Sequence, residues 1–285
     1  MDIDKLKPIL LSVGKAEHNA DWNWDSVCSP FARIYYIVEG SAQLLIDDTT
    51  LSLEPGCIYV VPPFVTHTTR CNSRFVHYYI HLYEEYMSGN WSFNKYELPY
   101  RVPSFQSDKA YFERLIEINP HMRLAESNPD TYDNRHTLMQ SVRNNKMRSD
   151  SLRMESRGLL YIILSHYLAQ ATPKEQNIDP RIDDSLTYIT DHLTDRLTVE
   201  QLASLSCVTP EYYIRLFRRY LYTTPMDYIN NKRMERAQLL LLATDTSVKT
   251  LSSQLGYTDP CYFNRVFKRT TGMTPRQYRS ENEKR

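Results

Sequence analysis

Between residues 31 and 83, apolar and polar positions alternate in short runs that turn residues interrupt. The runs cover residues 33–38, 42–46, 51–53, 58–61 and 75–83. Glu39-Gly40, Asp47-Asp48 and Pro55-Gly56 supply turns between them. Short runs at close, even spacing are typical of an antiparallel β-barrel or sandwich. We therefore predict an antiparallel β domain at the N-terminal end of the chain.

After Gly89, the apolar residues take up helical spacing, in segments 108–118, 130–142 and 152–170. The last segment is apolar over a broad face, so it either packs on the strands or forms a dimer face. The segment 171–180 is polar, contains two prolines, and is the best linker candidate. The predicted fold class is α+β, with a first domain over residues 1–175 and an all-α domain over 181–285.

The second domain contains an internal repeat. The sequence YYIRLFRR at 212–219 returns as YFNRVFKR at 262–269, and prolines pair at 210 and 260 and at 225 and 275. Repetition at a fixed period indicates one supersecondary unit used twice. Each copy predicts a short helix (198–206 or 248–255), a turn, and a second helix that Thr209 or Asp259 would cap. Leu202, Ala203 and Leu205 are expected to face inward, and an amphipathic helix over 226–243 would join the copies.

This pattern predicts two helix-turn-helix units, whose second helices enter the major groove of DNA. Tyr213, Phe217, Phe263 and Phe267 are expected to face the core. The candidate DNA-binding residues on the open side and its edge are Glu211, Ile214, Arg215, Arg218, Arg219, Cys261, Asn264, Arg265, Lys268 and Arg269. Arginine can bond guanine and asparagine can pair with adenine. The basic residues expected to contact phosphates or to be solvated are Arg219, Lys232, Arg233, Arg236, Arg269, Arg276 and Arg279.

The charge distribution favours the same region. The chain as a whole is neutral, with 34 basic and 34 acidic side chains, but residues 181–285 hold 16 of the basic and 12 of the acidic ones. The resulting net charge of +4, against −4 for residues 1–180, is modest. A local basic surface is the electrostatic footprint of a protein that binds a polyanion.

The five cysteines are odd in number and show no CxxC spacing, so neither a disulfide framework nor a structural zinc site is expected. The first fifteen residues show no cationic segment followed by an apolar core and cleavage site. The apolar stretch 159–169 is too short to span a bilayer. We expect a soluble, reduced, cytoplasmic protein without a cofactor and without a membrane partner.

From LTVEQLA at 197–203 to TPRQYR at 274–279, the chain resembles the AraC/XylS family of transcription regulators. The stretch GYTDPCYFNRVFKRTTGMTPRQYR at 256–279 matches that family nearly position for position. The resemblance implies that Arg215 and Arg265 contact bases, while Glu211, Ile214, Cys261 and Asn264 tune the sequence that is read.

The first helix-turn-helix unit departs from the family pattern. Cys207 stands where its turn usually has glycine, Ile214 is apolar, and Thr223-Thr224 replaces a glycine-containing turn. In the second unit, Ser252 replaces the usual alanine. We therefore expect the first helix-turn-helix unit to read fewer bases than the second helix-turn-helix unit.

Residues 31–83 resemble the cupin-like sensor domain common in this family. Gly56, Pro62, His67 and Cys71 fit the spacing of the second cupin motif, although Cys71 stands where that motif has asparagine. Cupin enzymes hold a metal with three histidines and a glutamate. Of these ligands only His67 remains, and Arg33 occupies the glutamate position, so no metal is expected.

The same comparison suggests a ligand pocket. An arginine at a cupin pocket position suits hydrogen bonding to a carboxylate, a phosphate or a sugar hydroxyl. His77, Tyr79 and His81 share one strand face. Such a face can bind a metal, but without a supporting carboxylate these residues are better interpreted as polar residues of the barrel interior or satisfied surface groups. Trp22 and Trp24 would supply flat walls or merely cover the barrel end. The candidate ligand-binding residues are Trp24, Arg33, Tyr35, His67, His77, Tyr79 and His81.

The sequence thus predicts a DNA-binding transcriptional regulator controlled by a small molecule, such as a sugar or small acid, in an N-terminal cupin-like barrel. The expected partners are double-stranded promoter DNA, the effector and a second copy of the chain, with RNA polymerase left open. The protein is not expected to be an enzyme. The alternatives are a metal-dependent cupin enzyme fused to a DNA-binding domain, and a DNA binder that needs no ligand.

Overall fold

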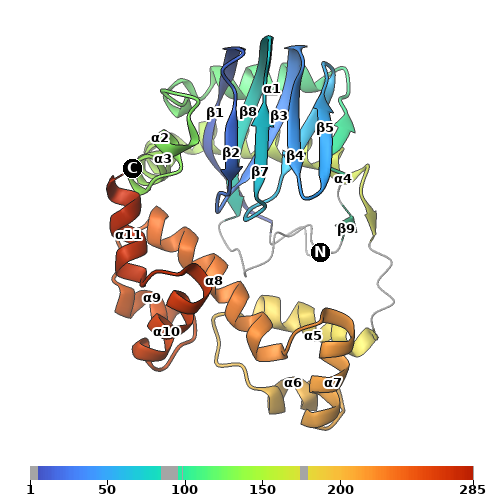
Figure 1. Ribbon diagram of the computed structural model, residues 1–285, viewed down its shortest axis with the longest axis vertical. Coiled ribbons are helices and arrows are strands. Elements are labelled where there is room, and N and C mark those ends of the chain that lie inside the picture. Colours follow the sequence, from blue (N-terminus) through green and yellow to red (C-terminus); the bar gives the residue numbers. More distant parts are fainter. Residues whose placement is uncertain (1–5, 85–95, 98, 174–178, 285) are drawn as a thin grey trace. The chain divides into compact units, whose positions relative to one another are not determined.

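A computed structural model describes residues 6–84, 96, 97, 99–173 and 179–284 (Figure 1). These residues form two compact units, one within 6–173 and the other within 179–284. The first unit consists of strands followed by helices, and the second consists of helices. The predicted α+β class is confirmed.

The strands of the first unit pair antiparallel, mainly in two sheets. One sheet has the strand order β1-β8-β3-β6-β10 and the other has the order β2-β7-β4-β5. A two-stranded pairing of β9 with β11 lies apart from these. The strands are β1 (Pro8–Asn19), β2 (Trp24–Val27), β3 (Ala32–Gly40), β4 (Ala42–Ile46), β5 (Thr49–Leu53), β6 (Cys57–Val61), β7 (His67–Arg70), β8 (Arg74–Glu84), β9 (Tyr96–Glu97), β10 (Arg101–Pro103) and β11 (Thr172–Pro173).

Side chains from both sheets meet in one core. Leu44 and Ile46 of β4 pack in the same buried cluster as Ile37, Tyr59 and Phe75 of the larger sheet. The two sheets therefore lie face to face, as in a sandwich. All five predicted runs coincide with strands β3, β4, β5, β6 and β8.

Strand β1 was missed because its sequence does not alternate. Except for the half-buried Ile9, its residues from Pro8 to Gly14 are buried, so both of its faces are covered over this length. A strand that is covered on both faces has no polar side to give a period of two. The missed strands β2, β7 and β10 are short.

The turn between β3 and β4 depends on Gly40. Its φ is 75°, and a Cβ placed there would lie 2.1 Å from the carbonyl oxygen of Arg74. Only glycine satisfies both the left-handed backbone and the close approach.

Helices follow the strands in the first unit: α1 (Asp108–Glu117), the 3-10 turn η2 (Pro120–Met122), α2 (Pro129–Tyr132), α3 (Arg135–Met147) and α4 (Asp150–Leu168). Helices α1, α3 and α4 pack against β1. The prediction of one helix over 130–142 is wrong, because the chain breaks between α2 and α3. There the Asn134 side chain accepts a hydrogen bond from the Thr137 amide and starts α3 anew.

The second unit contains the helices α5 (Pro180–Asp191), α6 (Val199–Leu205), α7 (Pro210–Leu221), α8 (Pro225–Ala243), α9 (Val248–Gln254), α10 (Pro260–Thr271) and α11 (Pro275–Lys284). Two buried clusters hold them together. Ile229 of α8 packs in the cluster with α5, α6 and α7, whereas Met234 and Leu241 of α8 pack in the cluster with α9 and α10. Helix α8 therefore belongs to both cores, and this unit can hold its two helix-turn-helix elements in a fixed relation (Figure 1).

Candidate DNA-binding surface and sensor core

Each helix-turn-helix element is defined by side-chain caps. The Thr198 hydroxyl accepts from the Gln201 amide and completes a capping box at α6, and the Thr209 hydroxyl accepts from the Tyr212 amide at α7. The Ser247 hydroxyl caps α9 in the same way. The Asp259 carboxylate accepts from the Cys261 amide at the start of α10, at 2.8 Å. Pro210 and Pro260 take the first helical position, where no amide hydrogen bond is lost.

The second helices α7 and α10 show the same burial pattern, position by position. Tyr213, Phe217, Phe263 and Phe267 are fully buried, as predicted. Eight of the ten candidate DNA-binding residues are exposed: Glu211, Arg215, Arg218, Arg219, Cys261, Arg265, Lys268 and Arg269. Ile214 and Asn264 are half-buried at the edge of that face. The exposed faces of α7 and α10 therefore carry six cations and one carboxylate, and each cationic position is matched between the two helices.

An aromatic ring lies under the first arginine of each exposed face. The Arg215 guanidinium lies 5.2 Å from the ring centroid of Tyr212, and that of Arg265 lies 5.8 Å from the ring centroid of Tyr262. Both tyrosines are partly exposed, at 36% and 44%. Each tyrosine precedes its arginine by three residues, about one helical turn, so this spacing is a signal that the sequence itself carries. Such a contact reduces the freedom of the arginine before any ligand arrives.

Two basic residues expected to contact phosphates or solvent lie elsewhere. Arg233 of α8 is buried, and its guanidinium donates to the carbonyl oxygens of Leu193 at 2.9 Å and Asp195 at 2.6 Å. Arg279 of α11 donates to the carbonyl oxygens of Leu241 and Thr246. That expectation is wrong for both residues, because each arginine satisfies main-chain oxygens inside the unit.

The first element also departs from the second at its turns. Leu205 is 56% exposed, so the prediction that it faces inward is wrong. It ends a helix of seven residues, one turn beyond the buried Leu202. Tyr222, rather than Thr223-Thr224, holds the left-handed position that Gly272 holds in the second element, with φ of 55° and 78°.

In the first unit, Arg33 of β3 is 1% exposed and already has polar partners from the chain. Its guanidinium donates to Asp133 Oδ2 at 2.6 Å, to the Tyr132 hydroxyl at 2.5 Å and to Ser29 Oγ at 2.5 Å. Arg33 Nε and Asp133 Oδ1 are buried without a hydrogen-bond partner among the described residues, so removal of either residue would leave the other as an uncompensated buried charge. The anion that the sequence suggested for Arg33 is thus supplied by the segment between α2 and α3.

The remaining candidate ligand residues lie on strands of both sheets. Tyr35, His67, His77, Tyr79 and His81 are buried, and Trp24 is half-buried. Tyr79 accepts from the Leu124 amide, and His81 Nδ1 lies 2.9 Å from Ser12 Oγ. Burial lowers the pKa of His67 to about 4 and the pKa values of His77 and His81 well below the usual range. These imidazoles are therefore neutral at pH 7.

Around His77, buried polar atoms lack partners. The ring centroid of His77 lies 5.4 Å from that of His18, 5.2 Å from that of Trp22 and 5.3 Å from that of Tyr35. Among the described residues, His77 Nδ1, His18 Nε2 and Trp24 Nε1 have no hydrogen-bond partner. The sequence does not predict His18, because β1 lacks the alternation that would reveal it, and it offers Trp22 only as a pocket wall or a cover for the barrel end. Buried polar atoms usually have partners, so this group can accept a polar molecule.

No cluster of three or more His, Cys, Asp or Glu side chains suited to a metal ion occurs within the described residues. Nor does any helix of the described ranges have the length and apolar character needed to cross a membrane.

Comparison with known proteins follows the division into units. The family model of an AraC-like ligand binding domain matches residues 11–120, and that of a helix-turn-helix domain matches residues 202–281. The arabinose operon regulatory protein of Salmonella typhimurium (strain LT2) is 34% identical over 104 residues, which cover 36% of this chain. The matched region spans only 37% of the length of that relative.

Another relative aligns over a longer part of the chain at lower sequence identity. The HTH-type transcriptional regulator YisR of Bacillus subtilis (strain 168) is 22% identical over 257 residues, which are 86% of this chain and 84% of that protein. Among solved structures, the C-terminal domain of the response regulator AraT from Geobacillus stearothermophilus matches 37% of this chain and 88% of its own at 30% identity, with a TM-score of 0.36.

Proposed function

The chain belongs to the AraC family of transcriptional regulators, and we propose that it recognises promoter DNA through α7 and α10 under the control of a small molecule bound in its first unit. One observation carries the proposal. The capped helices α7 and α10 show the same burial pattern and carry exposed cations at matching positions. One helix, α8, packs in the core of each of the two helix-turn-helix elements. That arrangement suits a partner that repeats, and two successive major grooves repeat about every 34 Å.

In this proposal the exposed residues divide into two roles. Arg215, Arg265 and Asn264 stand one turn into their helices, where side chains reach base edges, and Glu211, Ile214 and Cys261 tune the sequence that is read. Four cations stand further along the helices and contact phosphates, which supplies affinity that does not depend on the base sequence. They are Arg218, Arg219, Lys268 and Arg269. The second element carries Asn264 where the first carries the apolar Ile214, so it discriminates more among bases.

The proposed effector site lies between the sheets of the first unit. Tyr35, His77 and Tyr79, with Trp24 at its edge, offer aromatic surface and hydrogen-bonding atoms without a net charge. His67 and His81 are close enough to Arg33 for its charge to lower their pKa values. A neutral polar molecule such as a sugar fits this environment better than an acid, because Arg33 is already paired with Asp133. We place this regulator in the cytoplasm, where it binds DNA as a homodimer.

The proposal is tested by selecting bound DNA from a random double-stranded library with the full chain, with and without a panel of sugars. We expect enrichment of two short motifs about ten base pairs apart, with the more constrained motif assigned to α10. An Arg265→Ala variant should lose selectivity at one motif only. If no sequence is enriched under any condition, the proposed function is wrong. If enrichment is the same with every sugar and without one, the proposed DNA recognition stands and only the proposed regulation by a sugar is wrong.

A further inference from the structure

A second pocket in the first unit lies outside the space between the sheets. It is formed between β1 and the helices α3 and α4, and its volume is about 70 Å³. Pro8, Ile9, Leu10, Val142 and Leu160 give it apolar walls. Since one water needs roughly 10–15 Å³ measured this way, the pocket has room for a small polar group.

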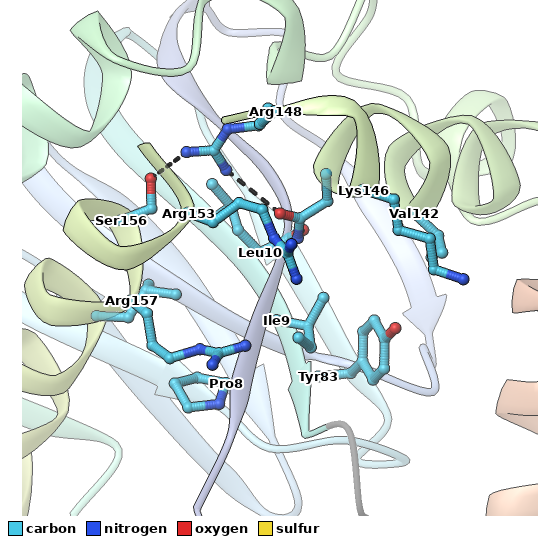
Figure 2. A pocket seen from close by; sticks show the side chains of 12 residues that line it. Pro8, Ile9, Leu10, Tyr83, Val142, Lys146, Arg148, Arg153, Ser156 and Arg157 are labelled. Atoms are coloured by element: carbon cyan, nitrogen blue, oxygen red, sulfur yellow. Dashed lines mark hydrogen bonds between the residues drawn. The ribbon is translucent and has the colours of Figure 1, made fainter. Parts of the chain in front are cut away.

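The polar side of this pocket is strongly basic. Lys146, Arg148, Arg153 and Arg157 all line it, and Figure 2 shows Arg153 and Arg157 reaching from α4 over Pro8 and Ile9 of β1. None of its twelve lining residues is an aspartate or glutamate. Four like charges around one concavity repel one another unless an anion joins them.

Two of these cations have no acidic partner within the part of the chain that the structure describes. Arg157 is half-buried and Lys146 is exposed, and neither forms an ion pair there. Among the described residues, the acidic partner of Arg153 is Asp150, whose side chain is 95% exposed. A half-buried guanidinium without a partner keeps its full capacity for a bidentate hydrogen bond.

Arg148 is held in place by the chain. Its guanidinium donates to the Leu152 carbonyl oxygen at 2.7 Å and to Ser156 Oγ at 2.5 Å, as Figure 2 shows for Ser156. Its Nε is buried and has no partner among the described residues. Burial and the neighbouring Arg153 charge lower the pKa of Arg148, so an anion beside it would relieve both effects.

We propose that this pocket binds a small anionic molecule through a phosphate or carboxylate group, held by Arg148, Arg153 and Arg157, with its apolar part against Ile9 and Leu160. The site is separate from the proposed effector core between the sheets, which is aromatic and uncharged. It does not depend on DNA binding, so it stands or falls by itself. The first unit would thus have a second ligand-binding site, for a ligand of a different chemical class.

The test is calorimetric titration of the full-length protein at low salt with inorganic phosphate and with hexanoate, and with 1-hexanol as the neutral counterpart. Arg157→Gln is the decisive variant, because this side chain supports no other described residue and its loss leaves the fold intact. Arg143→Gln on α3 is the matched control, since Arg143 is exposed and does not line the pocket.

We expect at least one of the two anions to bind, and Arg157→Gln to weaken it by about tenfold or more while Arg143→Gln does not. Binding of phosphate alone identifies a phosphate ester as the ligand class, and binding of hexanoate alone identifies a carboxylate. The proposal is overturned if neither anion binds at millimolar concentration, if 1-hexanol binds as well as hexanoate, or if both variants bind equally.

Discussion

Cys207 and Gly256 hold the same left-handed backbone position in the turns of the two helix-turn-helix elements, with φ of 53° and 75°. Glycine adopts this conformation freely, whereas a residue with a Cβ is strained there. At Gly256 an added Cβ would also lie 2.7 Å from the Thr194 carbonyl oxygen and 2.8 Å from Arg233 Nη2. The first element therefore carries strain that the second avoids, and the second turn is closed to any side chain.

The first prediction follows from this difference. Cys207→Gly should raise the free energy of unfolding by about 0.5–1 kcal/mol, because relief of the left-handed strain exceeds the added entropy of the unfolded chain. Gly256→Ala should lower it by about 2 kcal/mol or more, because strain and the contact with the Thr194 carbonyl add together. Scanning calorimetry of the full chain measures both. The idea is wrong if the two variants shift the transition in the same direction.

The second prediction concerns Arg233, which joins the segment before α6 to the turn after α9. It donates to the carbonyl oxygens of Leu193 and Asp195, and its guanidinium lies 5.1 Å from the ring centroid of Tyr257. Arg233→Met should lower the free energy of unfolding by about 2–4 kcal/mol, because two carbonyl oxygens lose charged donors. Chemical denaturation provides the measurement. Arg276→Met, at an exposed position, is the control and should have little effect.

The third prediction concerns Tyr262 and its contact with Arg265. Tyr262→Leu should weaken operator binding by about 0.5–1 kcal/mol, because Arg265 loses the ring that restricts it. Tyr262→Phe keeps the ring and should bind nearly as well as the original protein. Fluorescence anisotropy with the selected operator gives both affinities. Equal loss in the two variants would instead assign the effect to the tyrosine hydroxyl.

The sequence predicted the second unit better than the first, for a physical reason. Helix caps such as Thr209 and Asp259 and buried aromatic residues such as Phe217 and Phe267 act locally, so their pattern can be read from neighbouring positions. The exposed residues of α7 and α10 follow from the same spacing. The sequence could not predict that Arg233 is buried. An arginine on an amphipathic helix has the same local pattern whether its guanidinium contacts water or a buried carbonyl oxygen.

In the first unit, the important partners are far apart in the chain. Arg33 meets Asp133 a hundred residues later, and nothing near Arg33 indicates that an internal carboxylate will reach it. The polar and aromatic cluster around His77 includes His18, which follows from the pairing of β1 with β8. Pairings between distant strands are set by tertiary packing, and the buried strand β1 offered no alternation to reveal them.

The last prediction concerns pH and the buried histidines His67, His77 and His81. Burial lowers the pKa of His67 to about 4 and lowers those of His77 and His81 well below the usual range. In the unfolded chain the same imidazoles take up protons below about pH 6.5. The unfolded state therefore binds more protons between about pH 6.5 and 4, and stability in this window falls as the pH falls.

The first unit should thus lose about 1.4 kcal/mol of stability per pH unit for each such histidine as the pH drops from about 6.5 toward 4. His77→Phe removes one of the three while keeping a ring against Trp22 and Tyr35, so the slope should become shallower. His136→Gln changes an exposed histidine and serves as the matched control. Thermal unfolding followed at several pH values gives the slopes. Identical slopes for His77→Phe and His136→Gln would show that His77 takes up its proton in the folded state.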